Sequence, residues 1–250
     1  MNVKGKVILI AGGAGGIGVE LARFLGRGEA VIYLLDLNEE KGAEAVAELR
    51  EVSEKVYFVK MDLTSESSWQ ETIDHVCGRE GKIDVLINNA GINIRKPVEE
   101  MSIEEWSTMM LVNTGSVFLG CKYVIPVMKT QKGGSIINTS SVCGLIGHKY
   151  TTEAYTATKG AVTLLTKAIA SRYAQYGIRC NSIHPSTVMT PLVEEMLKDP
   201  QKSEERLGEV PLGRLATTDD IANAVLYLAS EEASFINGVS LPIDGGVTCY

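Results

Sequence analysis

Tyr155 and Lys159 are the two residues whose types and spacing most directly suggest chemistry in this sequence. They are four positions apart in a segment with helical spacing, and residues i and i+4 lie on one face of a helix. A tyrosine hydroxyl ionises near pH 10, so it transfers protons poorly at neutral pH. A lysine charge beside it favours the phenolate and lowers the pKa of the hydroxyl. The pair could therefore serve as a general acid and base, although the same spacing is common on ordinary amphipathic helices.

A glycine-rich turn follows the first apolar run of the chain. The run 7–11 is continuously apolar, which is typical of a strand buried on both faces of a parallel sheet, and helical spacing starts directly after the glycines. Glycines at such a turn let the backbone approach a pyrophosphate, which the positive end of the helix attracts. The pattern predicts a dinucleotide site. The residues expected there are Gly12, Gly15, Gly16, Ile17 and Gly18.

Asp36 closes the second apolar run, 31–35. A carboxylate at that position accepts hydrogen bonds from both ribose hydroxyls of an adenosine and repels a 2′-phosphate. No basic residue follows directly that would favour the phosphate. The alternative is that Asp36 only caps the helix that starts near Asn38. We therefore expect NAD rather than NADP as the cofactor, with Asp36 and Leu37 at its adenosine.

Strand and helix patterns alternate along the whole chain, and no linker or repeat interrupts them. This alternation predicts an α/β fold with right-handed crossovers and a doubly wound, mostly parallel sheet of about seven strands, flanked by helices on both faces. We expect a single domain over residues 1–250, with an irregular substrate loop or lid at about 186–212. Strands are expected at 7–11, 31–35, 56–61, 85–88, 135–138, 178–183 and 240–243. Helices are expected at 17–26, 39–50, 65–79, 103–128, 155–176 and 218–228.

Composition excludes several classes of function. The 250 residues carry a net charge of −7, and the 24 lysines and arginines are scattered, so a nucleic-acid surface is not expected. The N-terminus lacks the layout of a signal peptide, and no apolar run reaches about 18 residues, so no membrane span is expected. The five cysteines and three histidines are dispersed. We expect reduced thiols, a cytoplasmic location and no metal site.

Three motifs in this order resemble the short-chain dehydrogenase/reductase family. They are Gly12-x3-Gly16-x-Gly18, the run Asn88-Asn89-Ala90-Gly91 and Tyr155-x3-Lys159. The similarity continues to Asp244-Gly245-Gly246 near the C-terminus. It implies a single-domain, NAD-dependent oxidoreductase that interconverts a secondary alcohol and its ketone. It also implies a homotetramer, with the long helix near 109–128 and the Tyr155 helix at one interface.

The resemblance also implies roles for particular residues. Tyr155 would be the general acid and base, and Lys159 would lower its pKa and hold the nicotinamide ribose. Asn113 would kink the long helix and hold a water of a proton relay. Ser141 would position the substrate oxygen, with Ser140 as the second choice. The further cofactor contacts implied are Asp62, Leu63, Asn89, Ala90, Gly91, Pro185, Val188 and Thr190. The family usually has glycine where Ser186 stands and threonine where Ala11 stands.

The residues expected to face the substrate are largely apolar and contain no arginine cluster. This suits a hydroxysteroid, a cyclic or aryl alcohol, or another hydrophobic secondary alcohol. The alternative is a 3-oxoacyl-thioester reductase, against which Asp36 and the acidic surface argue. A more remote alternative is a dinucleotide-binding sensor without chemistry, against which the intact set of serine, tyrosine and lysine argues. The substrate contacts expected are Ser141, Cys143, His148, Tyr155, Met189 and Met196.

Overall fold

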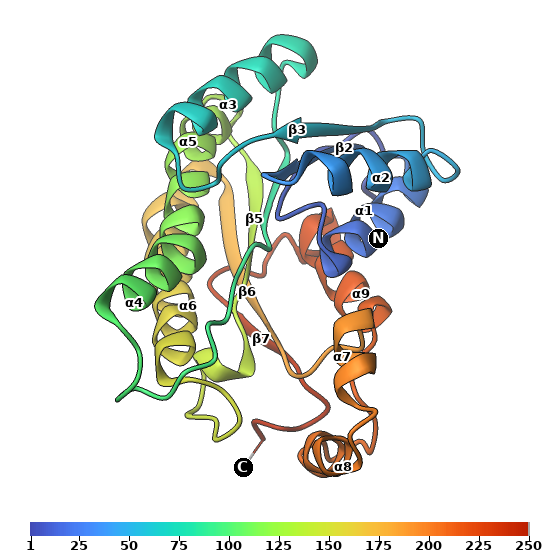
Figure 1. Ribbon diagram of the computed structural model, residues 1–250. Helices are drawn as coiled ribbons and strands as arrows, with labels where there is room; N and C mark the ends of the chain where they lie inside the picture. Colours follow the sequence, from blue (N-terminus) through green and yellow to red (C-terminus); the bar gives the residue numbers. More distant parts are fainter. Residues whose placement is uncertain (250) are drawn as a thin grey trace.

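A seven-stranded sheet forms the centre of the computed structural model, which describes residues 1–249 (Figure 1). The strand order is β3-β2-β1-β4-β5-β6-β7, and every neighbouring pair is parallel. The predicted doubly wound α/β fold is therefore confirmed, and its sheet is parallel throughout the described residues. The strands are β1 (Val7–Ala11), β2 (Val31–Asp36), β3 (Val56–Lys60), β4 (Val85–Asn88), β5 (Gly134–Thr139), β6 (Ile178–Pro185) and β7 (Ser240–Ile243).

The strand order reverses direction between β1 and β4. The chain moves outward from β1 to β2 and β3, then returns to place β4 on the other side of β1. The two loops that leave the carboxyl ends of β1 and β4 therefore diverge to opposite faces of the sheet and leave a crevice between them. The glycine turn and the run 89–91 lie at this point of the fold.

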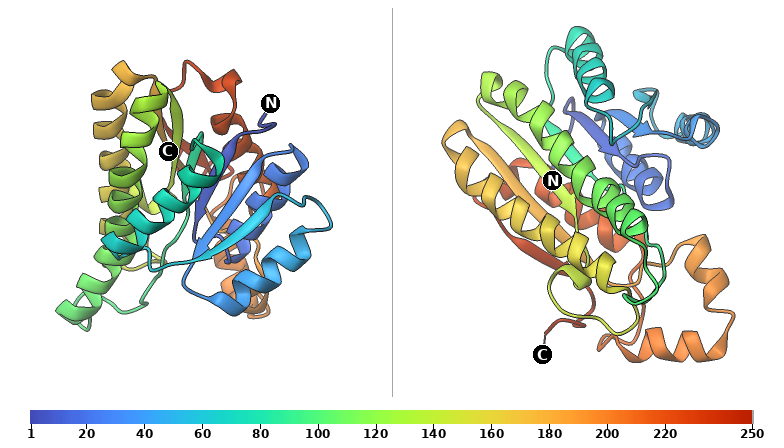
Figure 2. Two further views of the ribbon diagram at one scale, coloured as in Figure 1. Left: turned by 90° about the horizontal axis from the view of Figure 1, so that it is seen from above. Right: turned by 60° about the vertical axis from the view of Figure 1, so that its left-hand side comes forward.

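Helices cover both faces of the sheet, and each face has its own apolar core (Figures 1 and 2). Leu21, Leu25 and Leu228 pack on one face, whereas Trp69, Val124 and Val162 pack on the other. The first face carries α1 (Gly16–Arg27), α2 (Glu39–Leu49) and α9 (Thr218–Ala229). The second carries α3 (Glu66–Glu80), α4 (Ile103–Met110), α5 (Ser116–Gln131) and α6 (Glu153–Tyr173).

The long predicted helix is interrupted by one π-helical turn. α4 and α5 are continuous through Leu111–Gly115, whose backbone adopts π-helical hydrogen bonding. By length and composition alone, the whole segment Ile103–Gln131 could cross a membrane, with a mean hydropathy of 1.3 in its most apolar window. Core helices of water-soluble proteins pass the same test. Here 44% of that window is buried against the rest of the chain.

The segment predicted as an irregular lid contains two helices. These are α7 (Pro191–Met196) and α8 (Pro200–Gly208), and each begins with its proline. A proline in the first helical turn loses no hydrogen bond and has a φ angle already suited to the helix. The prolines therefore start helices here, in a stretch that the sequence predicted to be irregular. Figures 1 and 2 show the two helices projecting together at one end of the molecule, after the carboxyl end of β6.

Candidate active site

Tyr155 and Lys159 lie on one face of α6, in its first two turns. The hydroxyl of Thr152 caps the helix by accepting a hydrogen bond from the Tyr155 backbone N–H at 3.3 Å. Lys159 is 3% exposed, and its Nζ lies 5.6 Å from the centre of the Tyr155 ring. The ammonium donates a hydrogen bond of 2.8 Å to the carbonyl oxygen of Thr139, the last residue of β5. The helix and the strand end thus hold both side chains at the carboxyl edge of the sheet.

Burial, rather than charge attraction, dominates the acidity of this pair. It raises the pKa of Tyr155 to about 12, while a hydrogen bond with the Ser141 side chain opposes that increase. Burial also lowers the pKa of Lys159 to about 8. The expected lowering of the Tyr155 pKa by Lys159 is not seen in the chain by itself. The physical reason is that both groups leave water, which disfavours phenolate and ammonium alike.

The two serines after β5 have different surroundings. The Ser140 hydroxyl donates to the Lys159 backbone oxygen at 2.9 Å and lies 3.1 Å from the Thr163 hydroxyl, so it ties the strand to α6. Ser141 instead lines a cavity together with Tyr155. The geometry therefore favours Ser141 as the serine that faces a substrate.

His184 fixes the backbone of Ser141 from behind. Its Nδ1 lies 2.8 Å from the Ser141 carbonyl oxygen, which can only accept, so Nδ1 carries the proton. Its Nε2 then accepts from the Ser182 hydroxyl, also at 2.8 Å. Burial lowers the pKa of His184, which keeps the ring in this neutral form. His184 was not predicted as a site residue, and its place at the end of a buried strand was the only sequence signal.

Asn113 occupies the centre of the π-helical turn and is fully buried. Its Oδ1 accepts from the Ile92 N–H at 2.7 Å, and its Nδ2 donates to the Ile92 oxygen at 2.9 Å and the Thr158 hydroxyl at 3.1 Å. The π-helical turn interrupts the regular α-helical hydrogen bonding at the residue where the sequence predicted a kink. Gly91 lies beside both polar groups: a Cβ there would be 3.4 Å from Asn113 Oδ1 and from Lys159 Nζ.

The glycine turn leaves space that protein atoms do not fill. Gly12 has a φ of 76°, and a Cβ there would meet the Ala90 backbone at 2.7 Å, so it is required by packing. A Cβ on Gly15 or Gly16 would meet no heavy atom closer than 3.7 Å. Both are exposed at the N-terminus of α1, where free N–H groups point outward. Open space at that position fits the pyrophosphate of a dinucleotide.

The carboxylate of Asp36 lies beside this turn. Its Oδ2 accepts from the Ala14 N–H at 3.2 Å and its Oδ1 from the Asn38 N–H at 3.1 Å. The cap of α2 is Asn38, whose side chain accepts from the Lys41 N–H, so the capping alternative for Asp36 is wrong. Leu37 follows and is 64% exposed. The carboxylate is thus available next to the phosphate site.

The remaining predicted cofactor residues follow the same edge of the sheet. Asn89 donates through Nδ2 to the Gly12 oxygen at 3.3 Å and joins the two loops of the crevice. Asp62 is exposed after β3 and accepts from the Thr64 N–H and hydroxyl, and Leu63 follows it. Across the crevice, Pro185 ends β6, Val188 pairs with Ala216, and Thr190 directly precedes α7 without a side-chain capping hydrogen bond. The Thr190 Cγ2 lies 3.9 Å from the Cβ position of Gly16, so the lid begins beside the glycine turn.

A cavity of about 270 Å³ adjoins Tyr155 and Ser141. It lies between the loop after β4, the loop before α6, the lid helices and the chain near Val247. Five of the six predicted substrate residues line it, namely Ser141, Cys143, His148, Tyr155 and Met196. Met189 does not; its backbone N–H bonds to the Ala216 oxygen at 2.8 Å. Val188 lines the cavity too, so the cavity and the dinucleotide crevice meet.

The cavity is more polar than the sequence predicted. Arg95, Arg206 and Glu209 line it, and none of them was named as a site residue. The sequence predicts a largely apolar lining without an arginine cluster, and these three charged side chains are an addition to that lining. Arg206 and Glu209 belong to the lid segment, and their separation of three residues on a short helix was the available signal.

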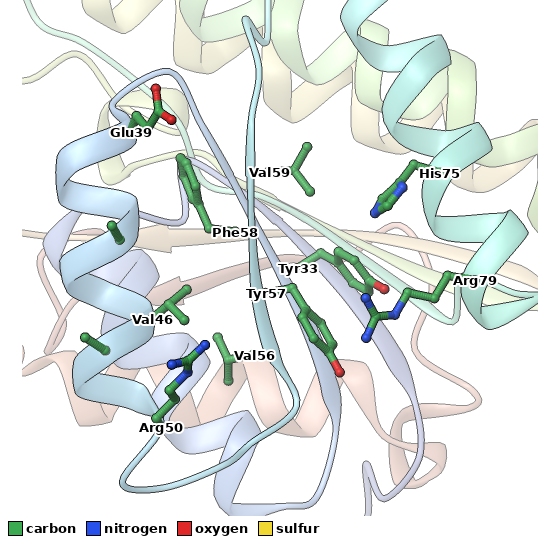
Figure 3. A pocket seen from close by; sticks show the side chains of 12 residues that line it. Tyr33, Glu39, Val46, Arg50, Val56, Tyr57, Phe58, Val59, His75 and Arg79 are labelled. Carbon is green, nitrogen blue, oxygen red and sulfur yellow. The ribbon is translucent and has the colours of Figure 1, made fainter.

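A larger hollow of about 460 Å³ lies elsewhere, on both sides of the edge strand β3 (Figure 3). Figure 3 shows Phe58 and Val46 on one side of the strand, and Tyr57, His75 and Arg79 on the other. None of the residues predicted for catalysis or cofactor binding lines it. Its walls are already paired with each other: the Arg79 guanidinium lies 4.1 Å from the centre of the Tyr57 ring. Size alone does not identify the active site here.

Comparisons with known proteins agree with this geometry. The family model described as "Enoyl-(Acyl carrier protein) reductase" matches residues 12–248. Cyclopentanol dehydrogenase of Comamonas testosteroni is 44% identical over 247 residues, 99% of this chain and 98% of that protein. The 2,5-dichloro-2,5-cyclohexadiene-1,4-diol dehydrogenase of Sphingobium indicum is 40% identical over 245 residues, which are 98% of this chain and 97% of that protein. The crystal structure of NAD⁺-bound xylitol dehydrogenase superposes with a TM-score of 0.93 at 32% identity. The superposition covers 98% of this chain and 100% of that one.

These matches extend over nearly the whole chain, and the TM-score of 0.93 shows that the solved structure has the same fold. They accompany a glycine turn that fits a nicotinamide dinucleotide and a cavity that holds Ser141 beside Tyr155. The chain therefore belongs to the short-chain dehydrogenase/reductase family and is an oxidoreductase of its alcohol–ketone type.

Proposed function

We propose that this protein is an NAD(H)-dependent dehydrogenase that interconverts a small, mainly hydrophobic ring alcohol and its ketone. The observation that carries the proposal is that Ser141, Tyr155 and Val188 line the same cavity. Tyr155 and Ser141 line a single cavity, and that cavity joins the dinucleotide crevice at Val188. When bound, the nicotinamide supplies or accepts the hydride.

The side chains of this cavity would handle the proton. Tyr155 would take the proton of the alcohol during oxidation and return it to the carbonyl oxygen during reduction. Ser141 would hold the same oxygen, and His184 would keep Ser141 in place through its carbonyl. A charged Lys159 near the phenol favours the phenolate, and the positive charge of oxidised nicotinamide acts in the same direction.

Asn113 would position these groups and support the proposed proton relay. Its amide joins the loop after β4 to Thr158, which lies between Tyr155 and Lys159 in the sequence. This contact fixes the helix turn on which the two reacting side chains stand. Orientation of this kind is the main contribution a protein makes to a transfer between two bound molecules.

The preference for NAD rests on Asp36. Its carboxylate lies within hydrogen-bonding distance of the Ala14 N–H, beside the open phosphate position, and no cation neutralises it in the described residues. A 2′-phosphate would approach this charge at close range and be repelled. Leu63, Asn89 and Thr190 would complete the contacts to the adenine, the ribose and the nicotinamide amide.

The size of the cavity favours a small ring over a steroid. Pockets for drug-sized ligands have volumes of roughly 300–1,000 Å³, and this one has about 270 Å³, part of it next to the crevice. Relatives with ring-alcohol names support the same class. A 3-oxoacyl thioester would require a longer channel, and Asp36 argues against the NADP that such reductases use.

We also propose that four copies assemble and that the enzyme works in the cytoplasm. Leu111 and Phe118 on the long helix and Leu164 on α6 are 51%, 51% and 69% exposed, although they are large and apolar. Exposed apolar side chains on neighbouring helices mark surfaces that bind another protein. Cys121, Cys143 and Cys180 are buried and unpaired, as in a reducing compartment.

The replacement Tyr155→Phe tests the assignment. We expect it to lower turnover of cyclopentanol or cyclohexanol by roughly 10²–10⁴-fold, which is the usual contribution of general acid–base catalysis. NADH binding, measured by fluorescence, should remain. Tyr173→Phe at the far end of α6 is the matched control and should keep full turnover. Retained turnover by Tyr155→Phe would overturn the proposed mechanism.

A further inference from the structure

The substrate cavity contains a group of charged side chains that the proton transfer does not use. His148 and Tyr150 come from the loop before α6, Arg206 from α8, and Glu209 from the residue that ends this helix. We call His148, Arg206 and Glu209 the polar wall. They connect the lid to the loop that follows Ser141.

The polar wall is held together by five contacts, three of which involve Tyr150. His148 Nε2 lies 3.3 Å from Glu209 Oε1, and Arg206 lies 3.6 Å from Glu209 Oε2. The guanidinium donates to the Tyr150 carbonyl oxygen at 3.1 Å and lies 4.9 Å from the centre of the Tyr150 ring. His148 Nδ1 accepts from the Tyr150 N–H at 3.4 Å, so the ring proton is on Nε2, facing the carboxylate.

These charges are largely removed from water. The side chains of His148, Arg206 and Glu209 are only 10%, 15% and 18% exposed. Their mutual contacts leave capacity unused: within residues 1–249 the guanidinium has one hydrogen bond, although it carries five N–H donors. The 3.6 Å separation from Glu209 is too long for a hydrogen bond. A ligand in the cavity can therefore meet both a donor and an acceptor.

The combination of a donor and an acceptor selects among substituents. A hydroxyl can accept from Arg206 and donate to Glu209 at the same time, whereas a carbonyl or carboxylate can only accept. A carboxylate would also approach the negative charge of Glu209. A plain hydrocarbon ring would offer no hydrogen bond to either group.

From these contacts we infer that the polar wall binds a second hydroxyl of the substrate. The preferred substrate is therefore a small ring alcohol with a further hydroxyl, a cyclic diol, rather than a simple cycloalkanol. This inference rests on the proposed function, because it assigns the reacting carbinol to Tyr155 and Ser141. It adds that the lid, through Arg206 and Glu209, determines which ring alcohols are accepted.

The test compares two alcohols of the same ring size. Purified enzyme with NAD⁺ is assayed on cyclohexanol and on cyclohexane-1,4-diol, and kcat/KM is measured for both. We expect the diol to be favoured at least about tenfold, the effect of one hydrogen bond to a charged group. Glu209→Gln should reduce that preference about tenfold, mainly through KM. Glu204→Gln, an exposed site on the same helix, should leave the preference unchanged.

Binding without turnover separates this inference from the proposed function. The enzyme–NADH complex is titrated with cyclohexanone and with 4-hydroxycyclohexanone, and fluorescence quenching gives both affinities. Tighter binding of the hydroxyketone that is lost in Glu209→Gln supports the inference, whether or not the enzyme oxidises a ring alcohol. Failure to oxidise any ring alcohol would overturn only the proposed function. Equal binding of the two ketones, or an equal or higher kcat/KM for cyclohexanol, overturns the inference. A preference for 4-hydroxycyclohexanecarboxylate over the diol also overturns it, because Arg95 or Arg206 would then bind an anion.

Discussion

Replacing Lys159 by methionine should make the dinucleotide-free protein more stable at neutral pH while it abolishes activity. The ammonium is 3% exposed, and burial lowers its pKa from 10.5 to about 8. The folded chain therefore binds this proton less tightly than the unfolded chain does. Below about pH 8 both states are protonated, and the folded state carries the full cost of the buried charge.

The pKa values give the size and the pH range of this cost. The difference of about 2.5 between them corresponds to about 3 kcal/mol at pH 7. Between about pH 8 and pH 10.5 the unfolded chain binds more protons, so the cost decreases as pH rises and is lost above that range. The replacement also leaves the Thr139 oxygen without its donor, a loss of about 1 kcal/mol. The net gain is about 2 kcal/mol, or an increase in Tm of about 4–8 °C.

Thermal unfolding of both proteins, without dinucleotide, at about pH 7 and about pH 9.5 measures this effect. By the higher pH the cost has fallen by about 2 kcal/mol, so the two Tm values should nearly coincide. Lys167→Met is the matched control on the same helix, since its ammonium is exposed and donates to the Gly238 oxygen at 3.0 Å. Unlike Lys159→Met, this control should not have a Tm that exceeds that of the unsubstituted protein at about pH 7 and equals it at about pH 9.5. A lower Tm for Lys159→Met at pH 7, or a gain independent of pH, would refute the reasoning.

Two further replacements test the dinucleotide site. Gly16→Ala should weaken NADH binding by roughly tenfold with little change in Tm, because its Cβ meets no protein atom closer than 3.9 Å but enters the space for the pyrophosphate. Gly18→Ala should instead lower the Tm, since its Cβ would lie 2.4 Å from the Gly12 oxygen; isothermal titration and thermal unfolding separate the two effects. Asp36→Ala should reduce the ratio of NAD⁺ to NADP⁺ turnover by at least about tenfold, and an unchanged ratio would remove Asp36 from the cofactor site.

The parts of the fold that the sequence predicts well are those with a strong local signal. β1 and β4 are continuous apolar runs, and both are fully enclosed between two helical layers, as such runs indicate. The glycine turn was located because only glycine tolerates the conformation of Gly12 and the close approach at Gly18. The face shared by Tyr155 and Lys159 follows from helical periodicity alone.

The features that escaped prediction depend on contacts between distant segments. Arg206 and Glu209 acquire a role only when α8 packs over the loop that carries His148 and Tyr150. The pKa of Tyr155 escaped for the same reason. The sequence shows a lysine four residues away, but the degree of burial that outweighs its charge depends on the whole tertiary structure. The lid helices escape prediction because prolines and charges are also typical of irregular segments.

This difference separates the chemistry of the enzyme from its specificity. The groups proposed to react stand on α6 and on the turn directly after β5. Apolar packing fixes the positions of β5 and α6, so a motif in the sequence is enough to place these groups. The groups proposed to choose the substrate stand on α8, a short helix with no fully buried residue, and they are held mainly by hydrogen bonds and ion pairs. Substitutions there would disturb little of the core. Substitutions in the lid can therefore change the substrate preference of the enzyme while the catalytic residues remain in place. Relatives that act on different ring substrates are expected to differ at the polar wall.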